Sequence, residues 1–371
     1  MILSKSKLDI KILCLTFSGT LLLRAPFWIF YFGIPRVQKS NLIHDWKMMC
    51  RWDCSDYFFL LAQKYTPSAF FPLFPLSAGF LHTLFPNLDV QLCLLITSWF
   101  FSFLFGVVFL YALDLFYPPD KTKIWGHNPL SWIIALLLSI YPHGHFFLEG
   151  YSESLFAFLF ALALLLFRKN IWMAALCFGL MAVTRAQGIW VLSIYIVCLI
   201  YSAYQELPKN KSTKLCYTHV LPMIISIIPL LVFMGWLWNQ TGDPLYFLHA
   251  QSSPQWGRHF QFLKGILNFL PRYDRAVFFL YFSCWAGYVL LRRKDILFKI
   301  LGGSSLMMAI IPIFFGGFFS YDRFVATNLA FFFILGELCQ KNKILLWIIT
   351  LLFIPAFGVQ IFYYASGRFA G

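Results

Sequence analysis

The feature that most constrains this chain is its succession of long apolar segments separated by short polar loops. Hydrophobic residues make up 60% of the 371 residues and charged residues only 12%, whereas about a quarter of the residues in a soluble domain are charged. A water-soluble fold of this length could not cover so much apolar surface. The sequence therefore predicts an integral membrane protein.

Eleven apolar segments come close to, or exceed, the length that a helix needs to cross a hydrocarbon core of about 30 Å. They lie at about residues 12–34, 88–116, 130–148, 152–167, 171–185, 187–204, 217–238, 276–291, 296–318, 324–339 and 343–364. We therefore expect an all-α, polytopic membrane protein with about eleven transmembrane helices. No repeat, low-complexity stretch or linker is visible, which predicts a single domain over residues 1–371. The first segment is too long for a signal peptide and lacks a small-residue cleavage site, so we expect it to be a retained span.

The basic residues indicate which loops face the cytoplasm, because Lys and Arg concentrate on that side. With a cytoplasmic N-terminus, every second loop is short and basic: Lys5/Lys7, Lys121/Lys123, Arg168/Lys169, Lys209/Lys211/Lys214, Arg292/Arg293/Lys294 and Lys341/Lys343. This rule accounts for most of the formal charge of +14, so we expect no nucleic-acid partner. This alternation of basic cytoplasmic loops and outer loops holds only if residues 68–86 do not cross the membrane as a full span. Their prolines support this, and we expect a re-entrant or interfacial segment in the long first outer loop.

Mixed charges mark the opposite side of the membrane. Two long loops, about 35–87 and 239–275, and three tight turns near 149–151, 185–187 and 319–323 carry both acidic and basic residues. Membrane insertion explains the basic cytoplasmic loops but not this set, so the outer side is the candidate site. Cys50 and Cys54 also lie there, four residues apart, and both a disulfide and a metal pair with His44 stay open. Cys14, Cys93, Cys177, Cys198 and Cys284 fall inside apolar runs and are expected to be small core residues.

The first outer loop contains Trp52, Asp53, Asp56 and Tyr57. Transfer of a group to a hydroxyl needs a carboxylate that accepts the proton, and aspartates three residues apart lie on one face of a helix. Asp53 and Asp56 are therefore candidate catalytic residues, and Trp52 is a candidate substrate contact. The alternative is that both aspartates cap or solvate a loop helix.

Two further outer turns carry carboxylates and an arginine. In Glu149-Gly150-Tyr151-Ser152-Glu153, Ser152 is expected to cap a helix that the Glu153 carboxylate then stabilises. Glu153 is also a third catalytic candidate, and Glu149 and Tyr151 are candidate substrate contacts. Arg185 is costly at a membrane boundary unless it is paired or hydrated. It either binds a phosphate or pairs with Glu149 or Glu153.

The second long loop begins with a Gly242-Asp243-Pro244 turn and continues with His249, Gln251 and Arg258. His249 and Arg258, with Arg323 in the last outer turn, are candidates to neutralise a phosphate leaving group. Asp243 and Gln251 are candidate substrate contacts. The alternative readings are an interfacial aromatic belt for the loop and a local ion pair for Arg323.

The motifs of nucleotide, zinc and serine-hydrolase chemistry are missing from the sequence. No Walker motif is visible that could drive ATP-dependent transport. We therefore expect no required cofactor, and a divalent metal near Asp53 and Glu153 stays an alternative.

Four motifs occur in an order that resembles the GPI mannosyltransferase 2 (PIG-V) family: Trp52-Asp53, Ala69-Phe70-Phe71-Pro72-Leu73-Phe74-Pro75-Leu76, Gly150-Tyr151-Ser152-Glu153-Ser154-Leu155-Phe156 and Thr184-Arg185-x-x-Gly188. A fifth is similar to the family's short bacterial relatives: Gly242-Asp243-Pro244, then His249-Ala250-Gln251, then Trp256-Gly257-Arg258. The matches run from about residue 44 to 260. The last hundred or so residues match only loosely.

The resemblance implies a GT-C glycosyltransferase that inverts the sugar linkage at the non-cytoplasmic face. The implied donor is a polyprenyl- or dolichyl-phosphate hexose, in this family mannose, and the implied general base is Asp53, with Asp56 as second choice. The chain is shorter than the eukaryotic members, which act on a GPI precursor. We therefore expect a bacterial inner-membrane relative with a glycolipid or glycan acceptor, and the endoplasmic reticulum is the alternative. The rival function is a secondary transporter or lipid flippase, whose polar residues would lie at the bilayer midplane.

Overall fold

The computed structural model describes residues 10–33, 49–62, 65–118, 123–206, 216–252, 274–315 and 321–367. Within these ranges the regular structure is helical, apart from one isolated bridge between Ile124 and His127. The predicted all-α fold class is therefore confirmed.

Each of the eleven expected segments contains a helix. These are α1 (Ile10–Gly33), α4 (Val90–Phe116), α5 (Pro129–Ser139), α6 (Glu153–Leu166), α7 (Ile171–Ala182), α8 (Ala186–Glu206), α10 (Leu221–Thr241), α13 (Asp274–Leu291), α14 (Ile296–Phe314), α16 (Leu329–Lys341) and α17 (Lys343–Ala365). Six described helices are long and apolar enough to cross a membrane, which confirms a polytopic membrane protein. Helices α5, α6 and α7 have only 11, 14 and 12 residues, so the number of crossings stays a prediction.

Shorter elements connect these helices. They are α2 (Asp53–Ala62), α3 (Leu73–Leu84), η2 (Gly144–Phe147), η4 (Cys216–Val220), α11 (Tyr246–Gln251) and α15 (Tyr321–Ala326). Helix α3 has 12 residues, which gives a length of about 18 Å at 1.5 Å per residue. That is shorter than a hydrocarbon core of about 30 Å, but α5 and α7 are equally short, so the expectation that residues 68–86 do not form a full span stays a prediction.

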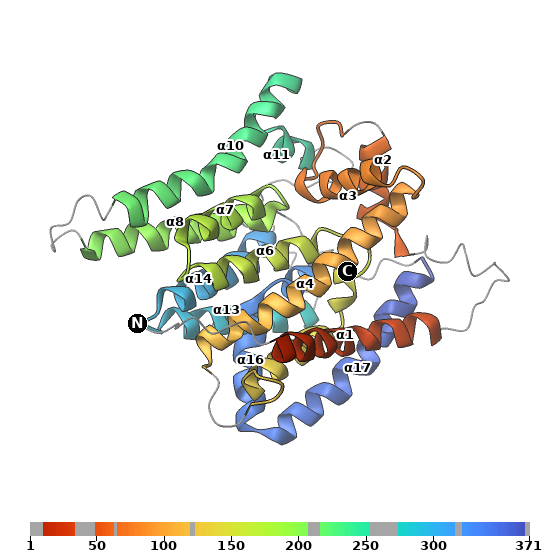
Figure 1. Cartoon of the computed structure of the whole chain (residues 1–371), viewed down its shortest axis with the longest axis vertical. Helices are drawn as coiled ribbons and strands as arrows, with labels where there is room; N and C mark the ends of the chain where they lie inside the picture. Colours follow the sequence, from red (N-terminus) through yellow and green to blue (C-terminus); the bar gives the residue numbers. More distant parts are fainter. Residues whose placement is uncertain are drawn as a thin grey trace.

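The long helices run side by side, and their ends form two opposite faces (Figure 1). Helix α4 packs against α6, α7 packs against both α6 and α10, and α14 packs against α8 and α13. Side chains such as Trp347 and Leu351 on α17 are 68% and 69% exposed. A surface this apolar is stable against lipid rather than against water. Cys14 also lies on the exposed side of α1, not in the core as expected, whereas Cys93, Cys177 and Cys198 are buried.

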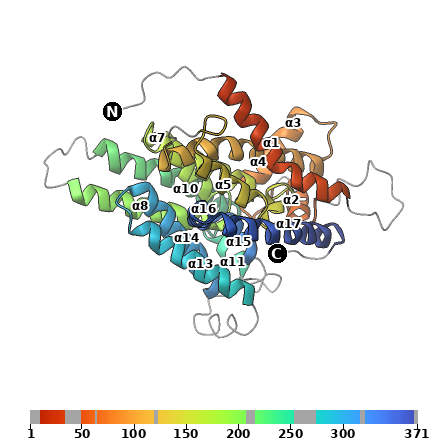
Figure 2. The ribbon, with the colours of Figure 1, turned by 90° about the horizontal axis from the view of Figure 1, so that it is seen from below.

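Helices α2 and α3 lie at the right-hand end of the bundle in Figure 1. The C-terminal end of α17 reaches the same region (Figure 2), where Arg51 Nη2 donates to the Ala365 carbonyl at 3.2 Å and the Tyr364 hydroxyl donates to the Met49 carbonyl at 3.0 Å. Cys50 and Cys54 form a disulfide, and His44, the third member of the alternative metal pair, lies outside the described residues. Two independent ties therefore hold the start of α2.

Candidate functional site

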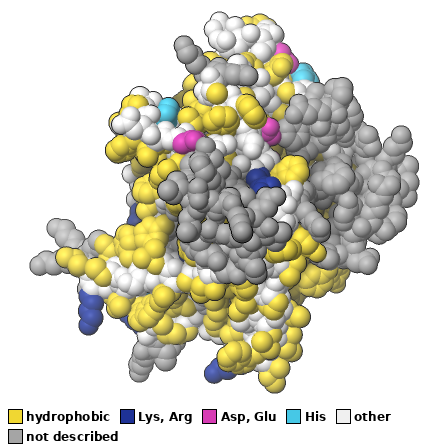
Figure 3. Space-filling view, turned by 90° about the vertical axis from the view of Figure 1, so that its right-hand side faces the viewer, with side chains coloured by type: hydrophobic (Ala, Val, Ile, Leu, Met, Phe, Trp, Pro, Cys, Tyr) yellow, Lys and Arg dark blue, Asp and Glu magenta, His cyan; other side chains and the backbone are white. Residues whose placement is uncertain are grey.

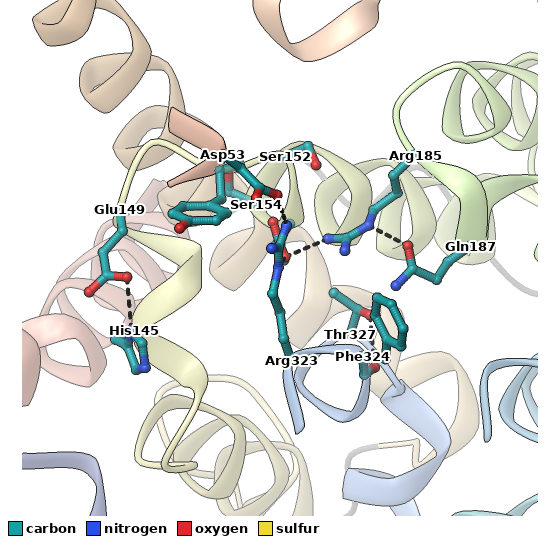
Figure 4. Close-up of polar contacts among 12 residues, drawn as sticks. Asp53, His145, Glu149, Ser152, Ser154, Arg185, Gln187, Arg323, Phe324 and Thr327 are labelled. Atoms are coloured by element: carbon teal, nitrogen blue, oxygen red, sulfur yellow. Dashed lines mark hydrogen bonds and ion pairs between the residues drawn. The ribbon is translucent and has the colours of Figure 1, made fainter. Parts of the chain in front are cut away.

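The centre of the site is Arg323, which bonds two carboxylates from distant parts of the chain. Its Nη2 donates to Asp53 Oδ2 at 2.6 Å, and its Nε donates to Glu153 Oε1. Asp53 is the first residue of α2, Glu153 is the first residue of α6, and Arg323 lies on α15. Figure 4 shows the guanidinium of Arg323 beside the carboxylate of Asp53. The fold therefore brings together three of the predicted site residues.

Arg185 extends this network. Its Nη1 lies 2.8 Å from Glu153 Oε1, and its Nε donates to Gln187 Oε1. Glu153 is completely buried, and Arg185 and Arg323 are only 7% and 5% exposed. The sequence left Glu149 and Glu153 as possible partners of Arg185, and in the structure Arg185 pairs with Glu153. Two cations and two carboxylates alternate along the chain of contacts, so the buried charges balance, as a low-dielectric site requires.

Parts of this network keep unused hydrogen-bonding capacity. Glu153 Oε2 is buried and has no hydrogen-bond partner in the described part of the chain. Arg185 Nη1 makes its ion pair without hydrogen-bond geometry and has no such partner there either. The network can therefore accept further polar groups.

Aromatic rings fix the position of Arg323. Its guanidinium carbon lies 4.5 Å from the ring centroid of Tyr151 and 5.3 Å from that of Phe146. Such cation–π contacts stabilise a cation that has left water. The Tyr151 hydroxyl in turn donates to the Arg51 carbonyl at 3.2 Å. Tyr151, predicted as a substrate contact, therefore lies behind Arg323, where it supports the arginine.

The turn before α6 differs from the expectation in one detail. Ser152 was expected to cap α6, but its backbone is helical and its side chain makes no capping bond. Its Oγ instead accepts a hydrogen bond from the Tyr57 hydroxyl at 3.2 Å. The preceding Gly150 has φ +70°, and a Cβ there would lie 2.5 Å from Cys54 Sγ. Close packing of this turn on the disulfide therefore takes precedence over local capping.

Glu149 does not join the arginines. It lies 2.9 Å from His145 Nδ1, and both side chains are buried. Burial, followed by the negative charge of Glu153, raises the pKa of Glu149 well above its ordinary value. The Glu149 and His145 pair lies on the side of Arg323 away from Arg185 in Figure 4.

A cavity of about 330 Å³ opens beside the network. Its polar lining includes Asp53, Arg185, Gln187, Gln251 and Arg323. The rest is mainly apolar: Tyr57, Ala69, Phe70, Phe71, Ala186, Ile189, Trp190, Phe247, Leu248, Pro312, Phe315 and Phe324. In Figure 3, acidic and basic side chains lie close together among hydrophobic ones on the face of the molecule seen there. An amphiphile with an anionic headgroup matches this combination, since fixed cations bind the anion and the aromatic lining packs on an apolar chain.

The other predicted residues lie outside the arginine network. Asp56 is half-buried, and burial, followed by the charge of Asp53, raises its pKa to about 6. Trp52 is 44% exposed. His249 Nδ1 lies 2.6 Å from Asp243 Oδ2, and its side chain is 63% exposed. This contact lowers the pKa of Asp243. Neither Asp243 nor His249 lines the cavity, and Arg258 lies outside the described residues.

Gln187 lines the cavity although the sequence reasoning selected only Arg185 from the same motif. Gly188 explains why Gln187 is so deeply placed. A Cβ at position 188 would lie 1.8 Å from the Met181 carbonyl oxygen, so only glycine lets the start of α8 pack this closely on the end of α7. The glycine directly after Ala186-Gln187 is the signal that could have pointed to Gln187.

A metal site does not emerge from the described residues, in which no group of three or more His, Cys, Asp or Glu side chains is placed to hold an ion. Both carboxylates at the site already bond Arg323. The described polar groups of the site are carboxylates, guanidinium groups and an amide.

Solved structures resemble this chain only in broad outline. The oligosaccharyltransferase of Archaeoglobus fulgidus, in its apo form, aligns with 99% of this chain and 55% of its own, at 13% identity and a TM-score of 0.48. The same enzyme in complex with zinc and sulfate aligns with 97% of this chain, with a TM-score of 0.46.

Sequence comparison gives a more specific result, although no protein-family model matches the chain. GPI alpha-1,6-mannosyltransferase 2 of Mus musculus is 34% identical over 150 residues, which is 38% of this chain and 29% of that protein. The protein of the same name from Homo sapiens is 32% identical over 172 residues, 43% of this chain and 34% of that protein. The chain thus matches about a third of the length of these curated relatives. Their names confirm the resemblance to the GPI mannosyltransferase 2 family over about two fifths of this chain.

Proposed function

We propose that this protein is a membrane glycosyltransferase that moves a hexose, mannose, from a polyprenyl- or dolichyl-phosphate donor to a hydroxyl of a lipid-linked or glycan acceptor. The observation that carries this proposal is the hydrogen bond between Asp53 and Arg323 at the edge of an aromatic-lined cavity. A carboxylate and a cation in contact supply the two groups that such a transfer needs. The similarity to named mannosyltransferases supports the same class of reaction.

The donor occupies the cavity with its phosphate against the arginines. Arg185 and Arg323 both line the cavity, and arginine matches the geometry of phosphate oxygens. The prenyl chain packs along the aromatic side, which includes Phe70, Phe71 and Phe315. This places the anomeric carbon of the sugar close to Asp53.

In the transfer step, Asp53 accepts the proton of the acceptor hydroxyl while the hydroxyl oxygen bonds to the anomeric carbon. The bond between that carbon and the phosphate oxygen breaks on the opposite side, so the linkage inverts. The donor phosphate has one negative charge and leaves with two, whereas Asp53 becomes neutral. The total charge is unchanged.

This charge movement gives Arg323 its role. Before the reaction Arg323 neutralises Asp53, and as the reaction proceeds the negative charge moves from Asp53 to the leaving phosphate. A guanidinium placed between the two stabilises the charge at both ends of the step. Fixed cations that are aimed at developing charge make a large contribution to catalysis in a site that excludes water.

The site faces the non-cytoplasmic side in this proposal. The short basic loops are assigned to the cytoplasm by the positive-inside rule, and α2 follows a loop on the other side. A disulfide between Cys50 and Cys54 is typical of an oxidising compartment. Both the bacterial periplasm and the lumen of the endoplasmic reticulum are oxidising, and we propose the bacterial inner membrane, with the endoplasmic reticulum as the alternative.

The scheme uses no cofactor. A divalent cation at Asp53 and Glu153 would have to displace Arg323, which bonds both carboxylates. A transporter would place its polar residues at the bilayer midplane, whereas this network is formed by the first residues of α2 and α6. That arrangement supports the transferase.

The proposal is tested with membranes that contain wild type or Asp53→Asn, supplied with polyprenyl-phosphate radiolabelled mannose and a lipid extract as acceptor. We expect wild type to label a product and Asp53→Asn, at equal abundance, to lose activity by at least about 100-fold, the contribution of a general base. Asp243→Asn is the matched control, because Asp243 is an outer carboxylate that does not line the cavity. Full activity of Asp53→Asn with loss in Asp56→Asn would move the base to Asp56.

A further inference from the structure

Gln187 has a side chain whose polar capacity the fold does not use. It lies in the first turn of α8 and is only 2% exposed. Its Nε2 has no hydrogen-bond partner among the residues that the structure describes. Burial of an amide nitrogen without a partner is unfavourable, which makes Nε2 a candidate to donate a hydrogen bond to a ligand.

The orientation of the amide is fixed by Arg185. Gln187 Oε1 accepts a hydrogen bond from Arg185 Nε, and a guanidinium has donors only. The reverse orientation would place the amide nitrogen, also a donor, against that donor. The Nε2 group must therefore point away from Arg185, and in the view of Figure 4 it is turned toward Phe324.

Gln187 and Phe324 both line the cavity, together with Arg185 and Arg323. The Nε2 atom itself is covered by protein atoms, so a ligand in the cavity reaches it only when this part of the lining shifts, and the ligand must then offer an acceptor oxygen. The sugar phosphate headgroup of the donor offers such oxygens on its hydroxyl groups and on its phosphate.

We propose that Gln187 is a donor-binding residue whose Nε2 donates a hydrogen bond to an oxygen of the sugar phosphate headgroup. This inference rests on the proposed function and names a contact that selects the headgroup. This hydrogen bond favours donors whose headgroup carries an acceptor oxygen next to Nε2. A headgroup that lacks this oxygen would leave the amide nitrogen unpaired.

A merely structural role for Gln187 would be to hold Arg185, and that role needs only Oε1. Gln187→Glu keeps an oxygen acceptor for Arg185 Nε but replaces the donor group with a second oxygen. Gln187→Leu removes both functions. Gln205→Glu is the matched control, because Gln205 lies on the exposed far end of the same helix.

The experiment compares the kinetics of transfer from polyprenyl-phosphate mannose by the full chain in membranes. For Gln187→Glu we expect the KM for the donor to rise about tenfold or more, with kcat within about threefold of wild type, and no change for Gln205→Glu. Inhibition by polyprenyl phosphate without the sugar identifies the oxygen. An unchanged inhibition constant assigns the contact to a sugar hydroxyl, and a parallel rise assigns it to the phosphate.

Donor-induced thermal stabilisation of the purified chain is measured alongside, so that the test does not depend on turnover. Equal donor KM and equal donor stabilisation in wild type and Gln187→Glu would overturn the role of Gln187. The role of Gln187 would also be overturned if only Gln187→Leu changed the donor KM and the donor stabilisation. The loss of the acceptor that holds Arg185 would then explain the change. Absence of transfer by wild type, with donor stabilisation lost in Gln187→Glu, would instead overturn the proposed function and keep the binding residue.

Discussion

Arg323 and Asp53 are joined by a hydrogen bond of 2.6 Å although 270 residues separate them in the sequence. The bond ties the short helix α15 to the first residue of α2. The same guanidinium bonds Glu153 at the start of α6. The site therefore depends on one cation that holds two carboxylates.

Removal of this cation should damage both stability and activity. In Arg323→Met the buried Glu153 keeps only Arg185, and Asp53 loses its partner, which is expected to cost about 3–5 kcal/mol. We expect a clear fall in Tm and loss of transfer. Arg293→Met is the matched control, because Arg293 bonds Glu337 outside the cavity and is partly exposed.

A double substitution separates the two effects. Arg323→Met with Glu153→Gln removes a cation and a carboxylate together, so part of the lost stability should return. Transfer should stay absent, because the leaving phosphate still lacks its cation. Recovery of transfer in the double variant would show that Arg323 only compensates Glu153.

Arg185→Lys tests the second cation at nearly constant charge. Lysine keeps one positive charge but loses the planar fork and the Nε donor that bonds Gln187. A charge-assisted hydrogen bond contributes about 1.5–3 kcal/mol, so we expect the KM for the donor to rise about tenfold or more. Arg168→Lys is the control, since Arg168 pairs with Asp295 and is half-exposed. An unchanged donor KM in Arg185→Lys would exclude Arg185 from phosphate binding.

Much of this network could be predicted from the sequence, and the reason is topological. Most of the charges that membrane insertion does not explain occur in outer loops and turns, which predicts that Asp53, Glu153, Arg185 and Arg323 lie at the same end of the bundle. Their grouping follows from topology together with the cost of isolated charges near lipid.

The pairing within the network could not be predicted in the same way. Whether Arg185 meets Glu149 or Glu153 depends on how α6, α7 and α8 pack, and that packing depends on close contacts such as Gly188 against Met181. Glu149 lies four residues after His145 and bonds it. The pattern of apolar residues does not predict that Glu149 pairs with this histidine rather than with an arginine. His249 likewise bonds Asp243 across a turn, away from the cavity.

The disulfide provides a test of how the general base is positioned. Asp53 lies inside the five-residue loop that Cys50 and Cys54 close, and closure of so short a loop contributes about 2 kcal/mol in the chain-entropy account. In Cys50→Ser with Cys54→Ser we expect transfer to fall about tenfold and the donor KM to change little. Reduction of wild type with dithiothreitol should give the same loss, and the double variant should not respond. Equal sensitivity of both proteins to the reductant would place the effect elsewhere.

The pH dependence of stability should report Asp56. Burial, followed by the charge of Asp53, raises the pKa of Asp56 from 3.8 to about 6. The folded chain therefore binds this proton more tightly than the unfolded chain does. The contribution of Asp56 to stability is fully present below about pH 4 and is lost as the pH rises through about 6.

Asp56→Asn cannot titrate, so the difference in Tm between the variant and wild type isolates this carboxyl. Between pH 4 and pH 7 we expect the Tm of wild type to fall relative to that of Asp56→Asn, with no further relative change at higher pH. Transfer by Asp56→Asn should persist at neutral pH, because Asp53 is the proposed base. A constant difference in Tm across this range would mean that Asp56 is no harder to ionise in the folded chain than in the unfolded one.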